Sequence, residues 1–191
     1  MGVAAHPHRE RQRVLLTGLL PDITTDPAIE AAADSLEAGR SGVIVAPVGI
    51  RPPLLAAVAS RAATPLVVLT ATGRDAETLT NALASWIPGV AMLPAWETLP
   101  HERLSPQVDT MARRIAVLRR LVHPVLGDDS AGPISVLVVP IRAFLQPIIS
   151  GLADLEPVRV RIGDIMDLTE TTNRLAELGY ERVDMVEGRG Q

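Results

Sequence analysis

Residues 45–52, with the sequence VAPVGIRP, stand where an α/β protein would place a phosphate-binding turn. They end a short apolar run and lead into a helical pattern, and such turns bind phosphate through closely approaching backbone N–H groups. The nucleotide-binding motif G-x-x-x-x-G-K-[ST] uses two glycines, a Lys for the phosphates and a hydroxyl for Mg²⁺. In this chain those four positions are held by Val45, Ile50, Arg51 and Pro52. We therefore expect a degenerate turn that binds no nucleotide or Mg²⁺.

Other residue types that carry chemistry are few. The chain has no Cys, which excludes thiolate metal sites and cysteine nucleophiles, and no two of its four His share the i, i+4 spacing of a helical metal site. The pair Asp128 and Asp129 could suggest a metal ligand set, but adjacent carboxylates in a Gly/Ser-rich loop more often make a turn. The sequence predicts no catalytic residue, no cofactor and no metal.

Charge and hydropathy restrict the class of partner. The formal net charge is -4, which argues against a domain built mainly to hold nucleic acid. All eighteen basic residues are Arg, so no Lys exists elsewhere to complete a nucleotide-binding motif. The N-terminus lacks the apolar segment of a secretory signal, and no later apolar run approaches the roughly 18 residues that span a bilayer. We expect a soluble cytoplasmic protein with no membrane contact.

Short apolar runs rich in β-branched residues alternate with helical patterns. The runs predict strands at residues 42–47, 65–70, 90–94, 134–140, 158–162 and 180–186. The segments between them predict helices at residues 27–39, 52–62, 74–87, 106–122, 141–149 and 168–179. This alternation is typical of an α/β domain with a mainly parallel sheet covered by helices.

The segment 107–122 has the clearest amphipathic pattern. At about 100° per residue its apolar face comprises Val108, Met111, Ile115, Leu118 and Val122. Arg113 and Arg120 point the opposite way. The pattern is that of a core-facing stripe with a solvated back; the alternative is a basic ridge that faces a phosphate backbone and also includes Arg114 and Arg119.

One stretch identifies a family. The segment LPAWETLPHERLSPQVDTMARRIAVLRRL (93–121) resembles the W-E-T-L-P-Y-[DE]-x-x-S-P segment and following helix near the N-terminus of the bacterial transcription-repair coupling factor, Mfd. His101 stands where the family has Tyr. Two further segments, 136–148 and 175–191, are similar to the next landmarks of that region. The matching residues are Trp96, Glu97, Thr98, Leu99, Pro100, Ser105, Pro106, Arg114 and Leu118.

The resemblance implies a fold and a role. This region of Mfd is similar to the excinuclease subunit UvrB, with a helicase-like domain and an inserted domain that binds UvrA. UvrB keeps its P-loop and Mfd has lost it, in agreement with the turn at 45–52. The prolines around Trp96 predict an extended connector in which Trp96 packs as an anchor and Ser105 or Pro106 opens the next helix. The connector would be the remnant of a lost DNA-handling element.

The resemblance also implies boundaries. Residues 1–27 would be a tail and lead-in, 28–150 the helicase-like α/β domain without a P-loop, and 151–191 the start of a smaller α+β inserted domain. The family's UvrA-contact residues would follow Gln191. ATP and Mg²⁺, and the contacts with RNA polymerase and DNA, would belong to parent domains absent here, so the parent would be an ATP-dependent DNA translocase and this part would not be an enzyme.

A second function remains open from the residues. A divergent UvrB or another α/β phosphate-handling enzyme could bind phosphate through Arg51 and a glycine turn such as TATGR (70–74).

Overall fold

A three-stranded parallel sheet forms the centre of the molecule. The computed structural model describes residues 15–97, 107–128, 130–158, 160, 163–177 and 180. The strands are β1 (Leu66–Thr70), β2 (Val90–Met92) and β3 (Val136–Pro140), in the order β1-β3-β2. The α-helices are α1 (Leu20–Thr24), α2 (Pro27–Glu37), α3 (Arg51–Arg61), α4 (Gly73–Leu83), α5 (Val108–Val122), α6 (Ile141–Phe144) and α7 (Leu168–Glu177). The α/β class expected from the sequence is confirmed.

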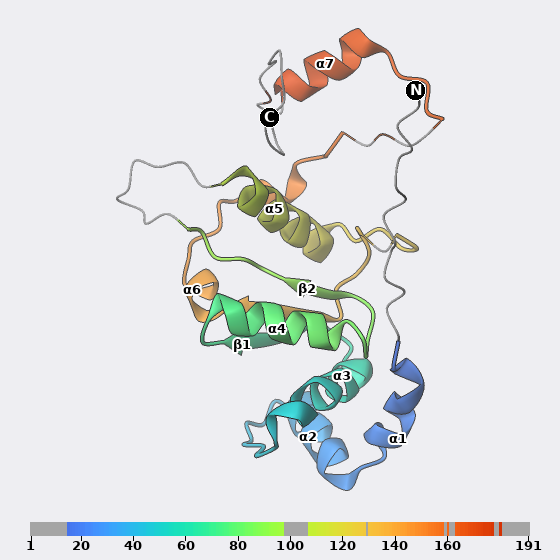
Figure 1. Ribbon diagram of the computed structural model, residues 1–191, viewed down its shortest axis with the longest axis vertical. Coiled ribbons are helices and arrows are strands. Elements are labelled where there is room, and N and C mark those ends of the chain that lie inside the picture. Colours follow the sequence, from blue (N-terminus) through green and yellow to red (C-terminus); the bar gives the residue numbers. More distant parts are fainter. Residues whose placement is uncertain are drawn as a thin grey trace, which may run out of the picture.

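Two apolar layers cover the sheet. All five residues of β3 are buried, as is typical of a central parallel strand. Val136 and Val138, both fully buried, face a cluster that includes alanines of α3 and Leu83 of α4. Leu137 and Val139 point to the other face and pack in a cluster with Val117 of α5. Figure 1 shows α1 to α3 on one side of the strands and α5 on the other.

The helix starts follow from capping residues. Asp26 accepts a hydrogen bond from the Ala28 amide at 2.8 Å, and Pro27 then occupies the first turn of α2. Thr72 caps α4 in the same way, accepting from the Asp75 amide at 3.1 Å. The expected end of α2 at a glycine is confirmed, since Gly39 has a φ of 65°.

The strand expected at 42–47 is wrong. These residues form no strand, and the side chains of Val43 and Val45 are 93% and 94% exposed. β3 already has both its neighbours, β1 and β2, and no described strand pairs with the outer edge of β1. The β-branched residues of 42–47 favour extended backbone, but a strand also needs a neighbouring strand to pair with its N–H and C=O groups.

The helix expected at 141–149 is shorter than its apolar pattern suggested. α6 ends at Phe144, and Gln146 precedes Pro147, whose ring disfavours helical backbone in the residue before it. The strands expected near the C-terminus fall largely outside the described residues, and Val158, Val160 and Tyr180, which are described, are not in strands. The residues Leu178 and Gly179 expected to end the last helix also lie outside that part.

The buried face of α5 differs from the expected stripe. Thr110, Arg114, Val117 and Leu118 are buried, whereas Val108, Met111 and Val122 are 45%, 37% and 56% exposed. The expectation counted only apolar side chains. The helix is turned so that Thr110 and Arg114 meet polar groups of the segment after β2, and those partners could not be read from the helix alone.

The lead-in and the chain after β3 also take part in packing. Leu20 of α1 is buried in the cluster with α3, and the Leu16 amide donates to the Ser85 carbonyl at 2.6 Å. Residues 152–154 form a single 3-10 turn that packs on α5. The proposed domain boundaries at 27/28 and 150/151 stay a prediction.

Candidate functional site at the carboxyl edge of the sheet

The carboxyl ends of the three strands meet at one edge of the sheet. Because all the strands are parallel, the segments after Thr70, Met92 and Pro140 converge there, at the place where open α/β sheets bind ligands. A cleft of about 510 Å³ lies at this edge. Its lining includes the start of α4, the connector after β2, the first turns of α5, and Arg142 of α6.

Trp96 is fixed from two directions. Its backbone amide donates to the Gln146 side-chain oxygen at 2.8 Å, and the Gln146 amide nitrogen donates back to the Trp96 carbonyl at 3.3 Å. The guanidinium of Arg114 lies 4.4 Å from the centroid of the indole ring, within the range of a cation–π interaction. These contacts are consistent with the anchoring role expected for Trp96, which stays a prediction; Gln146, fifty residues away, gave no signal in the sequence.

Arg114 is the buried centre of this arrangement. Its side chain is among the largest that are fully buried, and the residue is 1% exposed. One terminal nitrogen donates to the Pro94 carbonyl at 2.6 Å. Burial lowers the pKa of the guanidinium from its ordinary value. Arg114, identified as a family residue, thus supports the connector from inside and does not face solvent.

Glu97 attaches the connector to α5 and α6 through hydrogen bonds. Thr110 donates its hydroxyl to the Glu97 carboxylate, and Arg142 donates to the Glu97 carbonyl at 3.1 Å. Burial raises the pKa of this carboxyl, but hydrogen bonds from Thr110 and from the Glu97 and Gln107 amides, with the charge of Arg142, outweigh it, so the net pKa lies below its ordinary value. The i, i+4 spacing of Thr110 and Arg114 could have indicated a shared polar face.

The described part of the cleft lining carries no excess of positive charge. Among the described residues it contains two arginines, Arg113 and Arg142, and three carboxylates, those of Glu77, Glu97 and Asp109. Arg113 is already paired with Asp109 at 2.5 Å. The negative charge of a polyphosphate would be repelled by more carboxylates than there are unpaired guanidinium groups to bind it. This lining therefore favours a ligand or surface that is neutral or carries both signs of charge.

The degenerate turn lies at the start of α3. Val48–Ile50 form a 3-10 turn and Arg51 begins the helix. Pro52 and Pro53 follow within the first turn, where neither residue has the backbone N–H that a bound phosphate would need. Val45 is exposed on an extended segment without a preceding strand.

The arginines of α5 have separate partners. Arg120 donates through Nε to the Gly132 carbonyl at 2.8 Å and through a terminal nitrogen to the Pro133 carbonyl at 3.4 Å. Burial lowers the pKa of Arg120, partly opposed by the charge of Asp128. Arg119 binds residues 153–156. A DNA-facing role, suggested for Arg113 and Arg120, stays a prediction.

The remaining expected residues are either outside the described part or in ordinary turns. Thr98, Leu99, Pro100, His101, Ser105 and Pro106 lie outside the described residues. Asp128 accepts hydrogen bonds from the amides of Ser130 and Ala131 and from the Ser130 hydroxyl, which is a turn of the kind expected. Asp129 is not described. Among the described residues, no group of three or more His, Asp or Glu could hold a metal, and no helix is long and apolar enough to cross a membrane.

These features define a small parallel α/β unit whose carboxyl edge carries a cleft lined in part by the connector after β2. No protein-family model matches the chain. The transcription-repair-coupling factor of Mycobacterium bovis is 46% identical over 150 residues, which cover 78% of this chain and 12% of that protein. The factor from Mycobacterium tuberculosis gives the same values. The Escherichia coli factor is 26% identical over 140 residues, 72% of this chain and 12% of that protein.

The chain therefore belongs, over the matched residues, to the transcription-repair-coupling factors, and the family recognised from its sequence is confirmed. It spans about an eighth of the length of these relatives.

Proposed function

We propose that the chain is a non-catalytic, UvrB-like module of a transcription-coupled DNA repair factor. In the whole protein it would help to recruit UvrA and the excision-repair machinery to stalled RNA polymerase in the cytoplasm. Motor activity with ATP and Mg²⁺, and the contacts with RNA polymerase and DNA, would belong to other parts of the parent. The names of the relatives, all transcription-repair-coupling factors, support the repair role.

One observation carries the non-catalytic part of the proposal. At the edge where a parallel α/β sheet offers its loops to a ligand, the chain's own connector forms part of the cleft wall, held by Arg114 at Pro94 and by Gln146 at Trp96. The prolines in the first turn of α3 also support the non-catalytic role, because they remove backbone N–H groups from the degenerate turn. A scaffold of this kind retains a rigid shape for presenting other surfaces while it lacks groups for nucleotide chemistry.

Calorimetric titration of the 191-residue chain with Mg-ATP tests the lack of nucleotide binding. We expect no heat of binding above dilution. A micromolar dissociation constant would show that residues 45–52, or another turn, form a working site. The variant Arg51→Gln serves as the matched control, because its titration would reveal whether any signal depends on the one cation at the motif's Lys position.

A pull-down with UvrA tests the recruitment role. It compares the 191-residue chain with a longer piece of the same parent that continues past Gln191. We expect the longer piece to retain UvrA and the shorter one to retain much less. Retention by neither piece would contradict the recruitment proposal, and equal retention by both would place the contact within these residues.

A phosphate-handling function is the second candidate, because Thr72 and Gly73 of the TATGR turn line the cleft. The local contacts oppose it: the Thr72 hydroxyl is engaged by Asp75, whose carboxylate lies in the first turn of α4 where an anion would bind. Titration of inorganic phosphate, followed by the amide NMR signal of Gly73, decides the point. We expect no saturable shift.

A further inference from the structure

Beyond Gln146, which binds the Trp96 backbone, the described chain after α6 is held to the α/β unit by a polar joint at residues 152–156. Ala143 is buried, but none of the described residues that follow it is. Ile148 and Ile149 are 53% and 76% exposed, and α7 has no buried residue. Residues 152–156 nevertheless pack on α5. Because no residue of this segment is fully buried and its apolar residues Leu152 and Ala153 are only half-buried, polar contacts contribute a large part of its attachment.

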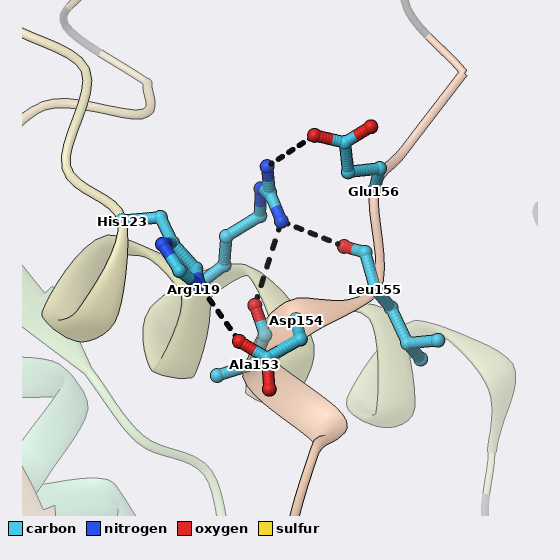
Figure 2. Close-up of polar contacts among 6 residues, drawn as sticks. All are labelled: Arg119, His123, Ala153, Asp154, Leu155 and Glu156. Carbon is cyan, nitrogen blue, oxygen red and sulfur yellow. Dashed lines mark hydrogen bonds and ion pairs between the residues drawn. The ribbon is translucent and has the colours of Figure 1, made fainter.

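Arg119 supplies most of those contacts (Figure 2). Its guanidinium donates to the Leu155 carbonyl at 3.1 Å and to the Ala153 carbonyl at 3.5 Å. A second terminal nitrogen lies 3.6 Å from the Glu156 carboxylate. The Arg119 side chain is 19% exposed, so it reaches these acceptors from a largely covered position. The planar fork of Arg can hold several acceptors at once, which a Lys ammonium at this place could not do in the same geometry.

His123, one helical turn further on, holds the same segment. Its Nε2 lies 2.7 Å from an Asp154 carboxylate oxygen, and both side chains are substantially exposed. The segment begins after Gly151, whose φ of 81° sets the turn, and the Asp154 amide donates to the Gly151 carbonyl at 3.0 Å. Four consecutive residues, 153–156, are thus tied to two side chains, Arg119 in the last turn of α5 and His123 directly after it.

The attachment has features of a joint that can open. Its carboxylates, Asp154 and Glu156, are 65% and 73% exposed, so water competes for them and salt screens them. Among the described residues, the buried Nε–H of Arg119 has no hydrogen-bond partner, a desolvated donor that opposes the closed arrangement. Opening would expose little apolar surface, so the closed and open arrangements differ by few interactions.

We propose that residues 152–156 are a releasable strap, fastened to α5 by Arg119 and His123, that opens as a unit while the α/β unit stays folded. Closed, the strap fixes the direction in which the chain leaves the α/β unit; open, it frees everything after Glu156 to move relative to that unit. This conformational device goes beyond the proposed recruitment role and does not depend on it.

Hydrogen exchange measured by mass spectrometry on the 191-residue chain tests the strap. In the unaltered chain we expect the amides of residues 152–156 to be protected, but less than those of β3. In Arg119→Gln we expect their exchange to rise about tenfold, the effect of losing charge-assisted hydrogen bonds, with β3 and α4 unchanged. Arg113→Gln is the matched control: Arg113 lies in the same helix, its partner among the described residues is Asp109, and the variant should change nothing in the strap.

Further variants keep the test decisive if Arg119→Gln perturbs the whole fold. Asp154→Asn removes the negative charge that faces His123 and should raise strap exchange by a smaller factor, and Arg119→Lys should restore protection only in part. High salt should raise strap exchange in the unaltered chain and leave β3 as it was. Strap protection that is insensitive to Asp154→Asn and to salt, or equal to that of β3, would overturn the proposal.

Discussion

Arg114 is a charged residue that forms the buried centre of the contacts around Trp96. A run of apolar and basic residues in a helix normally turns its arginines to solvent. Here the guanidinium is enclosed because Pro94 offers a carbonyl and Trp96 an aromatic face at the same place. The stem of Arg also packs as an apolar group, so the residue supplies both volume and charge to the interior.

Arg114→Ala should lower the free energy of unfolding by about 3 kcal/mol, because it leaves the Pro94 carbonyl without its donor and removes the support of the indole ring. Urea denaturation followed by tryptophan fluorescence measures the change. The neighbouring Arg113→Ala, which removes an exposed pair within one helix, should stay within about 0.5 kcal/mol of the parent chain. Equal losses in the two variants would contradict the structural role of Arg114.

Glu97 makes the connector sensitive to acid. Its folded-state pKa is depressed, so the carboxylate stabilises the folded state above the pKa of the unfolded chain, and this contribution is lost as the pH falls through the lower folded value. We expect Glu97→Gln to unfold more easily than the parent chain at neutral pH and to lose less stability on acidification below about pH 4. Urea midpoints of both chains across this range measure the difference; parallel curves would exclude it.

Helix α5 acts as a common support at the scale of the element. Its arginines bind backbone carbonyls of three separate segments: Arg114 the connector after β2, Arg120 the loop before β3, and Arg119 the strap after α6. Backbone acceptors do not depend on the side chains of those segments. One helix therefore fixes three connecting segments. Its contacts with their carbonyls explain why polar side chains lie on the packed side of α5.

The start of β2 contains a glycine that the packing requires. Gly89 has a φ of 73°, and a Cβ there would lie 2.8 Å from the Pro133 carbonyl oxygen and from the Ser135 hydroxyl. Gly89→Ala should therefore lower the free energy of unfolding by about 2–4 kcal/mol, because strain and overlap act together. Gly73→Ala, with no heavy atom within 4 Å and a place at the start of α4, should be neutral or slightly stabilising. Thermal unfolding of the two variants provides the comparison.

The whole molecule divides into a packed α/β unit and a tail of exposed elements. Figure 1 shows α7 apart from the sheet, and its described residues bury no side chain. The stability of the unit must therefore come from the two clusters around β3. The outer edge of β1 and the exposed apolar run 43–45 indicate where further chain could add to the sheet.

Removal of residues 159–191 should change the melting temperature of the chain by less than about 2 °C, because the described part of that segment contributes no buried residue. Removal of residues 151–191 should lower it further, by about 2–4 °C, since Arg119 and His123 then lose their partners. Calorimetry of both truncated chains checks this. A large loss on removing 159–191 alone would mean that the C-terminal elements support the core.

The predicted α/β class followed from local patterns. Three of the six expected strands and most of the helices occur where apolar periodicity and capping residues such as Asp26 and Thr72 indicated them. The degenerate motif was also accessible, because glycine, lysine and proline have defined backbone and chemical properties at each position. The failure at 42–47 has a physical cause: a strand depends on a partner that its own residues do not specify.

The sequence by itself determined the family, the α/β class and the absence of a standard phosphate-binding motif at residues 45–52, because these depend on residue identity at short spacing. Only the tertiary structure decided which face of α5 is buried, that Gln146 and Arg114 hold Trp96, and that Arg119 holds the strap at 152–156. Those contacts join residues up to 50 positions apart, mostly through backbone carbonyls. Every residue has such a carbonyl, so no side-chain pattern predicts which carbonyl an arginine will bind.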